Sequence, residues 1–200
     1  MSLMLPSGTP LTLPLLETSR LRLRRLTLDD APDVFLYNSD PEVVRYLLWT
    51  EHMTLAESRA DIERVIKGYD KGSDLRWGIE LKSTGRIIGG CKLTCVPEHK
   101  RAEIGYVLAR GCWGQGYAPE AVCAILKHGF EVIGLNRIEA LTFAEHAVSG
   151  RVLEKCGFQL EATLRGYELI KGKFRDLRMY SVLKQEWKDR EIGEPGDRLI

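Results

Sequence analysis

The chain has 200 residues, of which 44% are hydrophobic and 28% charged, the composition of an ordinary soluble globular protein. Its formal net charge of +1 argues against a polybasic nucleic-acid or membrane binder and against an acidic disordered tail. The length suits one domain that buries its core without disulfide or metal staples. The five cysteines have no framework spacing, so we expect reduced thiols and a cytoplasmic location.

We expect one folded domain over residues 18–187 between two tails. Three prolines interrupt the apolar residues of 1–17 and no charge precedes Glu17, which predicts an extended tail rather than a signal peptide. Residues 188–200 are charged and broken by glycine and proline, which predicts a frayed C-terminal tail. No apolar run approaches the roughly 18 residues that a membrane span needs.

In the first half of the domain, the sequence predicts one strand, three helices and three antiparallel strands. Leucine and arginine alternate over residues 19–26 as in a half-buried strand. Capping signals at residues 27–30, 40–41 and 54–57 predict three helix starts. Strands are then predicted at residues 75–81, 87–96 and 101–108.

The second half alternates helices and strands. A glycine-rich loop at residues 110–117 leads into a predicted helix over 118–133, whose apolar face lies opposite Glu120 and Lys127. The remaining predicted elements are a strand at 137–143, a helix at 147–156 and a hairpin of 159–167 with 173–183. This order predicts a mixed α/β domain with a partly antiparallel sheet.

Three glycines, Gly111, Gly114 and Gly116, stand directly before the long helix. Backbone N–H groups and the helix dipole could form a phosphate or pyrophosphate cradle there, although a tight turn that binds nothing would also need glycine. Tyr117 and Ala118 stand where a P-loop needs Lys-Ser/Thr, which disfavours ATP hydrolysis. The glycine spacing does not fit a dinucleotide-binding turn either.

The loop Trp113-Gly114-Gln115-Gly116-Tyr117-Ala118 resembles the acyl-coenzyme A pyrophosphate loop of the GNAT superfamily of N-acetyltransferases. With Glu103-Ile104-Gly105-Tyr106 and the segment 151–158, the chain resembles the RimJ/RimL type, whose members acetylate protein N-termini. The resemblance spans about residues 18–187. It implies the GNAT fold, an α/β (α+β) domain with a mixed, mostly antiparallel sheet of about seven strands, and acetyl-coenzyme A as co-substrate without a metal.

The same resemblance implies how coenzyme A would bind. Amides of residues 113–118 would hold the pyrophosphate, and the pantetheine arm would pair with residues 104–108, where a bulge at Gly105 would part this strand from strand 137–143. A backbone N–H of Val107 or Leu108 would polarise the thioester carbonyl. The implied cofactor-binding residues are Ile104, Tyr106, Val107, Leu108, Trp113, Gly114, Gln115, Gly116, Tyr117, Ala118, His146 and Ser149.

Three residues are candidates for catalysis. Ser149 could hydrogen-bond the leaving sulfur, or it could satisfy its own helix N-terminus. Glu168 matches the carboxylate position of RimL-type enzymes and is our first candidate for the base, with Glu103 as its rival, although Glu103 could instead form a cross-strand charge pair. Leu153 occupies the position where many GNAT enzymes carry a tyrosine general acid, so we expect that acid to be absent.

We expect acetyl transfer to a primary amine by direct attack in a ternary complex, with a protein N-terminal α-amine as the favoured acceptor. A small amine (an amino acid, polyamine or aminoglycoside) remains an alternative acceptor, and a non-catalytic acyl-coenzyme A binding protein remains an alternative class. We expect no nucleic-acid or membrane partner, and a monomer or homodimer. The histidines His52, His99 and His128 are expected to be solvated.

Overall fold

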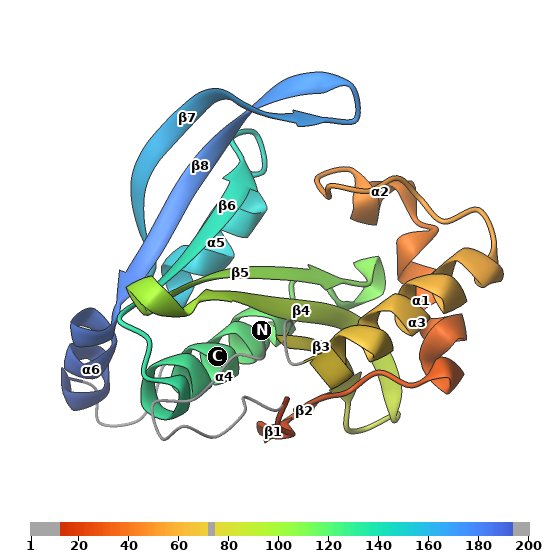
Figure 1. Ribbon diagram of the computed structural model, residues 1–200, viewed down its shortest axis with the longest axis horizontal. Helices are drawn as coiled ribbons and strands as arrows, with labels where there is room; N and C mark the ends of the chain where they lie inside the picture. Colours follow the sequence, from red (N-terminus) through yellow and green to blue (C-terminus); the bar gives the residue numbers. More distant parts are fainter. Residues whose placement is uncertain (1–12, 72–74, 194–200) are drawn as a thin grey trace.

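A computed structural model describes residues 13–71 and 75–193 and contains one mixed sheet flanked by helices (Figure 1). The sheet has eight strands in the order β1-β2-β3-β4-β5-β6-β8-β7. Every neighbouring pair is antiparallel except β5 with β6, which is parallel. The structure therefore confirms the mixed, mostly antiparallel sheet, with eight strands rather than the seven expected.

The additional strand is β1, which lies in the segment predicted as an extended tail. Two residues are too few to show a period, but Leu16 pairs with Leu23 of the next strand. The strands are β1 (Leu16–Glu17), β2 (Leu21–Arg24), β3 (Leu75–Leu81), β4 (Arg86–Val96), β5 (Arg101–Leu108), β6 (Arg137–Phe143), β7 (Gln159–Ile170) and β8 (Lys173–Leu183).

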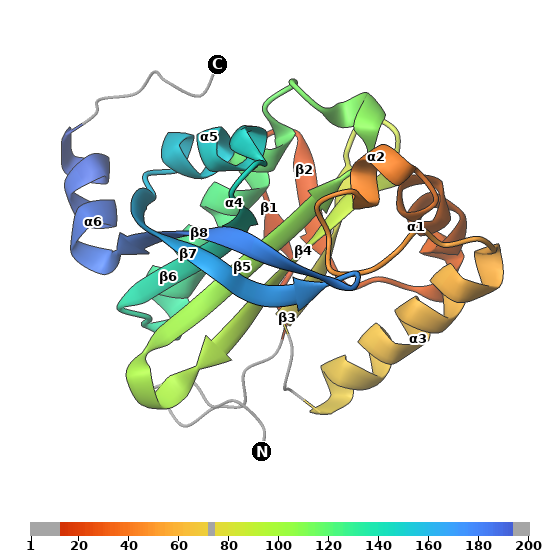
Figure 2. The ribbon, with the colours of Figure 1, turned by 90° about the horizontal axis from the view of Figure 1, so that it is seen from above.

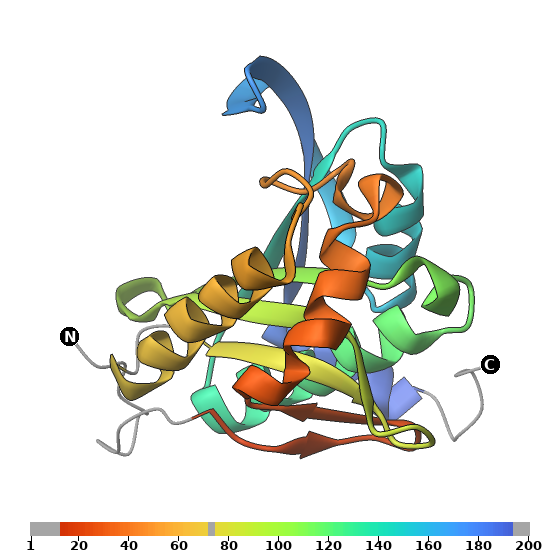
Figure 3. The ribbon, with the colours of Figure 1, turned by 90° about the vertical axis from the view of Figure 1, so that its right-hand side faces the viewer.

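The helices are α1 (Ala31–Asn38), α2 (Pro41–Val44), α3 (Leu55–Lys71), α4 (Tyr117–Lys127), α5 (Ala147–Lys155) and α6 (Lys184–Gly193). Figures 2 and 3 show α1 and α3 on one face of the sheet and α4 on the other. The terminal α6 extends past Lys188, where a tail was expected, because residues 184–191 are good helix formers. No described helix is long and apolar enough to cross a membrane. The five cysteines all lie among the described residues, and none of them forms a disulfide bond.

The parallel pair β5–β6 is short. Its register joins residues 101–103 to 137–139 and then stops. On its other edge, β5 pairs with β4 without a register shift from residue 101 to 108, so the bulge predicted at Gly105 is absent. Gly105 instead makes room for Lys92, since a Cβ on this glycine would lie 3.1 Å from the Lys92 Cε. The strands part because β5 follows β4 while β6 follows β8, and the two halves of the sheet twist apart.

The β7–β8 hairpin extends beyond the rest of the sheet and reaches toward α2 (Figure 1). Near its tip, the Nζ of Lys171 donates a hydrogen bond of 2.8 Å to the carbonyl oxygen of Val44. Phe143, Ile170 and Leu177 form a small buried cluster beneath the hairpin. The hairpin and the α2 region therefore enclose the space where β5 and β6 part.

Two residues of the long helical segment that were expected to face solvent are buried in the structure. A π-helical turn over His128–Ile133 follows α4, so the helical face shifts and His128 becomes buried against Trp77. Burial lowers the His128 pKa. The other expected histidines differ from each other: His52 is half-buried with its Nδ1 2.7 Å from the Ser58 Oγ, and His99 is exposed.

Glu120, expected on the polar face of the helix, is also buried. Its carboxylate accepts hydrogen bonds from the Thr18 and Ser19 hydroxyls and from the backbone N–H of Arg20, and it forms an ion pair of 2.6 Å with the Arg20 guanidinium. Burial alone would raise the Glu120 pKa, but these donors hold it below the ordinary value. Glu120 therefore ties the segment before β2 to the first turn of α4.

We predict that Glu120→Gln lowers the free energy of unfolding by about 2 kcal/mol at neutral pH, since charge-assisted hydrogen bonds are lost. The folded pKa is lowered, so this stabilisation is present above the ordinary value of 4.5 and is lost as the pH falls below it. Denaturant titrations should show the gap between variant and wild type shrinking in acid. The exposed Glu131→Gln is the control and should change stability by less than about 0.5 kcal/mol. An E120Q deficit equal at all pH values would contradict this explanation.

Candidate active site

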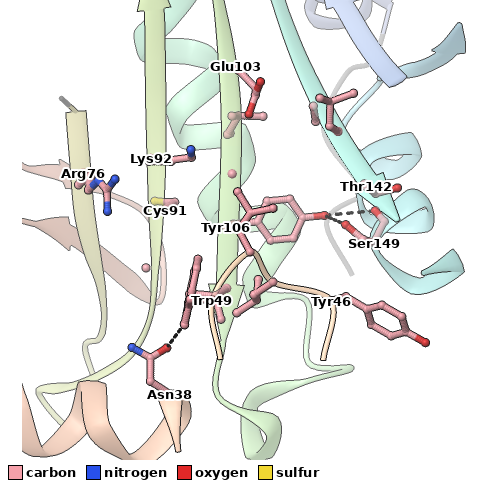
Figure 4. Close-up of a pocket in the computed structure, with 18 of the residues that line it drawn as sticks. Asn38, Tyr46, Trp49, Arg76, Cys91, Lys92, Glu103, Tyr106, Thr142 and Ser149 are labelled. Atoms are coloured by element: carbon pink, nitrogen blue, oxygen red, sulfur yellow. Dashed lines mark hydrogen bonds between the residues drawn. The ribbon is translucent and has the colours of Figure 1, made fainter. Parts of the chain in front are cut away.

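A cavity of about 670 Å³ lies where β5 and β6 part, within the usual size range of ligand pockets (Figure 4). Its walls come from the α1–α3 region, from strands β3 to β6, from the start of α5 and from the hairpin. Seven residues singled out from the sequence line it: Glu103, Ile104, Tyr106, Val107, His146, Ser149 and Glu168. Leu108 and residues 113–118 do not line it, because they lie at and beyond the end of β5.

The edge of β5 that faces the gap carries free backbone groups at alternate residues. Ala109 donates its N–H to the Ile88 carbonyl at 2.8 Å, which makes Leu108 and Gly89 a non-hydrogen-bonded pair. By alternation, Val107 bonds to β4, whereas the N–H groups of Tyr106 and Leu108 face away from β4 toward the gap, beyond the last β5–β6 pair at Glu103 and Glu139. Of the two residues considered as oxyanion donors, the geometry therefore favours Leu108 over Val107.

The glycine loop presents backbone N–H groups beyond the end of β5. Gly114 and Gly116 have φ values of +74° and +80°, which side-chain-bearing residues rarely adopt. No hydrogen bond to another described residue is made by the N–H groups of residues 114–116. The Arg20 guanidinium holds the carbonyl of Gln115 at 3.0 Å, and since N–H and C=O of one trans peptide point in opposite directions, the Gly116 N–H points away from Arg20. At the N-terminus of α4, this arrangement can bind an anion.

The side chains of the loop are directed elsewhere. The Trp113 indole donates to the Leu108 carbonyl at 2.9 Å, and the Gln115 amide donates to the Gly111 carbonyl at 2.8 Å. Both side chains are therefore engaged within the protein, and the loop offers a ligand mainly its backbone.

Tyr106 has a side-chain contact that the sequence analysis missed. Its hydroxyl lies 2.8 Å from the Ser149 Oγ and 3.2 Å from the Ser149 carbonyl oxygen (Figure 4). Burial raises the Tyr106 pKa, so the phenol stays neutral and acts as a hydrogen-bonding partner. Strand alternation, which puts Tyr106 on the same face as Ile104 and Leu108, was the available signal that its side chain would point toward the α4–α5 side.

The two candidate bases face the cavity from opposite sides, Glu103 from β5 and Glu168 from β7. A register shift between Leu164 and Glu168 interrupts the β7–β8 pairing just before Glu168, and the Asp176 carboxylate accepts a hydrogen bond from the Gly166 N–H there, at 2.7 Å. Neither glutamate forms an ion pair with another described residue. The cross-strand charge pair considered for Glu103 is therefore not present among the described residues.

The remaining wall residues are aromatic or neutral. His146 stacks on Tyr46 with ring centroids 4.3 Å apart, and burial lowers its pKa, so the imidazole is neutral at pH 7. The Trp49 indole donates to the Asn38 side-chain oxygen at 3.2 Å. Leu153 is fully buried in the main core, so the helix position of the usual tyrosine acid is filled by a packing residue.

Comparisons with known proteins identify relatives over most of the chain. A family model described as "Acetyltransferase (GNAT) domain" matches residues 20–159. "Uncharacterized N-acetyltransferase p20" from Bacillus licheniformis is 40% identical over 173 residues, and "Uncharacterized N-acetyltransferase YoaA" from Bacillus subtilis (strain 168) is 36% identical over 172 residues; each match covers 86% of this chain and 97% of the relative. The structure of the acetyltransferase (GNAT family) from Bacillus anthracis is similar with a TM-score of 0.77 and 26% identity, covering 86% of this chain and 99% of that one.

Proposed function

Because the chain belongs to the GNAT family, it is an acetyl-coenzyme A-dependent N-acetyltransferase, and we propose that its acceptor is a protein N-terminal α-amine, as in RimJ/RimL-type enzymes. The observation that carries this proposal is the mixed charge of the cavity. Three basic and three acidic side chains line it: Arg64, Arg76, Lys92, Asp61, Glu103 and Glu168. A polyamine would meet several cations there, whereas a peptide N-terminus brings at most one positive charge.

The chemistry of the amine supports the same choice. An α-amine has a pKa of about 7.7–8.0, so a substantial minority is already neutral near pH 7.5. A lysine amine, with a pKa near 10.4, would be neutral only about once in a thousand molecules. A single half-buried carboxylate is therefore a sufficient base for an α-amine.

Two more distant relatives have named acceptors, and they differ. "Putative ribosomal N-acetyltransferase YdaF" from Bacillus subtilis (strain 168) is 33% identical over 90 residues, 45% of this chain. "Spermidine N(1)-acetyltransferase" from Vibrio cholerae is 24% identical over 173 residues, 86% of this chain. The second relative makes a polyamine the rival acceptor, and the basic residues of the cavity count against that rival.

The chain offers coenzyme A two sets of backbone donors. The amides of residues 114–118 would bind the pyrophosphate, and the free edge of β5 at Tyr106 and Leu108 would pair with the amides of the pantetheine arm. When bound, the cofactor supplies the acetyl group as a thioester. This fit needs no basic surface, because oriented amides and the dipole of α4 provide the positive potential.

The side chains around the gap have separate roles in this proposal. Glu168 accepts the proton of the attacking amine, and Glu103 is the rival for that role. The Leu108 N–H donates to the acyl carbonyl oxygen. Tyr106 holds Ser149, whose hydroxyl donates to the leaving sulfur from the N-terminal turn of α5, where the helix dipole favours negative charge.

We predict that Gly114→Ala weakens coenzyme A binding by about tenfold or more, because a side chain at this positive-φ position strains the cradle and obstructs the phosphates. Gly85→Ala is the matched control, since Gly85 also has a positive φ and open space around it but lies in the β3–β4 turn. Calorimetry should show a change in Kd for G114A only. An equal Kd for the two variants would rule the loop out as the binding cradle.

Glu168→Gln should lower kcat/KM for an N-terminal peptide by about 100-fold or more, the contribution of a positioned base, without changing coenzyme A affinity. Glu103→Gln should change kcat/KM less than about threefold. Thiol-release assays with a peptide and with spermidine measure both variants. If E103Q shows the large loss and E168Q does not, the two roles are reversed; if only spermidine is acetylated by the wild type, the acceptor proposed here is wrong.

A further inference from the structure

The charges of the cavity wall determine which N-terminal acceptors the enzyme selects, if its acceptor is the one proposed above. Lys92 and Arg76 are register partners on adjacent strands, and both line the cavity on the α1–α3 side of the sheet (Figure 4). The third basic residue of the wall, Arg64, is already paired with Asp61 at 2.9 Å. Arg76 also has an interaction of its own, which leaves Lys92 of β4.

Lys92 is the least committed of these cations. It is half-buried, and it forms no hydrogen bond or ion pair with any other residue in the described part of the chain. Partial burial of an unpaired charge costs free energy, so an ammonium without a counter-ion in a cavity wall is suited to an anionic group of a ligand.

Gly105 allows Lys92 to lie across the neighbouring strand. The two residues are register partners, and a side chain on Gly105 would meet the Cγ, Cδ and Cε atoms of Lys92 at 3.1–3.9 Å. With glycine there, the aliphatic stem of Lys92 can pass over β5, the strand that borders the gap. Gly105, where the sequence predicts a strand bulge, thus allows a cation to lie beside the acceptor cavity.

A carboxylate faces the same space close by. Glu103 is the next residue on that face of β5 after Gly105, so it stands diagonal to Lys92, at a Cα spacing of about 7–8 Å for such pairs. Because Glu103 repels an anion further along β5, a ligand carboxylate in this part of the cavity is directed to Lys92, while the reacting amine faces Glu168.

We propose that the acceptor carries a carboxylate within one residue of the reacting amine, and that Lys92 selects it. An N-terminal peptide with Asp or Glu at its first or second position has this chemistry, and so does a free amino acid through its α-carboxylate. The peptide is the acceptor that agrees with the proposed function. The experiment described next tests both the peptide and a free amino acid as acceptors.

The test compares kcat/KM for two peptides that differ only at the second residue, Ser-Glu and Ser-Lys, with free glutamate and spermidine as further acceptors. The wild type should prefer Ser-Glu by about tenfold or more, the effect of one charge-assisted hydrogen bond. Lys92→Met should reduce this preference to less than about threefold, Lys92→Glu should reverse it, and Lys92→Arg should keep it. Lys127→Met, an exposed lysine of α4, is the control and should keep the wild-type ratio.

Each outcome bears on one of the two claims. Acetylation of both peptides at equal rates, or a preference that K92M leaves intact, would overturn the selection by Lys92 while the N-terminal function stands. Turnover of glutamate but of neither peptide, with loss in K92M, would keep the carboxylate selection and overturn the proposed acceptor. Turnover of spermidine alone would overturn both.

Discussion

The parallel pairing of β5 and β6 ends after three residues on each strand, and the site exists because of that ending. Continued pairing would have consumed the N–H groups of Tyr106 and Leu108, which instead face a gap. It would also have closed the space that Tyr106 crosses to reach Ser149. The β7–β8 hairpin then covers the gap and brings Glu168 to the side opposite Glu103. One interruption in a sheet thus provides a slot for a cofactor arm and a cavity for an acceptor.

A chain with a net charge of +1 can still bind a highly anionic cofactor. The positive potential comes from oriented backbone groups, which add no formal charge. Arg20 contributes by holding a loop carbonyl, and its own charge is balanced by Glu120. The same network fixes the start of the domain to α4, so the stability of this corner and the shape of the loop depend on the same few contacts. The cofactor loop therefore needs no charged side chains of its own, and the charged side chains of the acceptor cavity can discriminate between amines.

The sequence predicted the elements and the loop well because periodicity, caps and glycine spacing are local signals. It predicted less well what depends on two distant segments. Glu120 looked solvated because its partners are about a hundred residues away, at Thr18 to Arg20. Gly105 suggested a bulge because the Lys92 stem that occupies its space belongs to another strand. His128 is buried because a π-helical turn shifts the helical face, and the pattern of apolar residues did not predict that turn. Strand alternation predicts the face of β5 on which Tyr106 lies, but its contact with Ser149 also depends on how α5 packs against β5.

The most direct measurement is a crystal structure of the protein with coenzyme A and an N-terminal Ser-Glu peptide. We predict pyrophosphate oxygens on the amides of residues 114–118 and pantetheine amides paired with the open edge of β5. We also predict that the sulfur lies against the Ser149 hydroxyl and that the peptide amine faces Glu168. Coenzyme A bound away from the gap, or β5 and β6 paired past residues 103 and 139 in the complex, would contradict it.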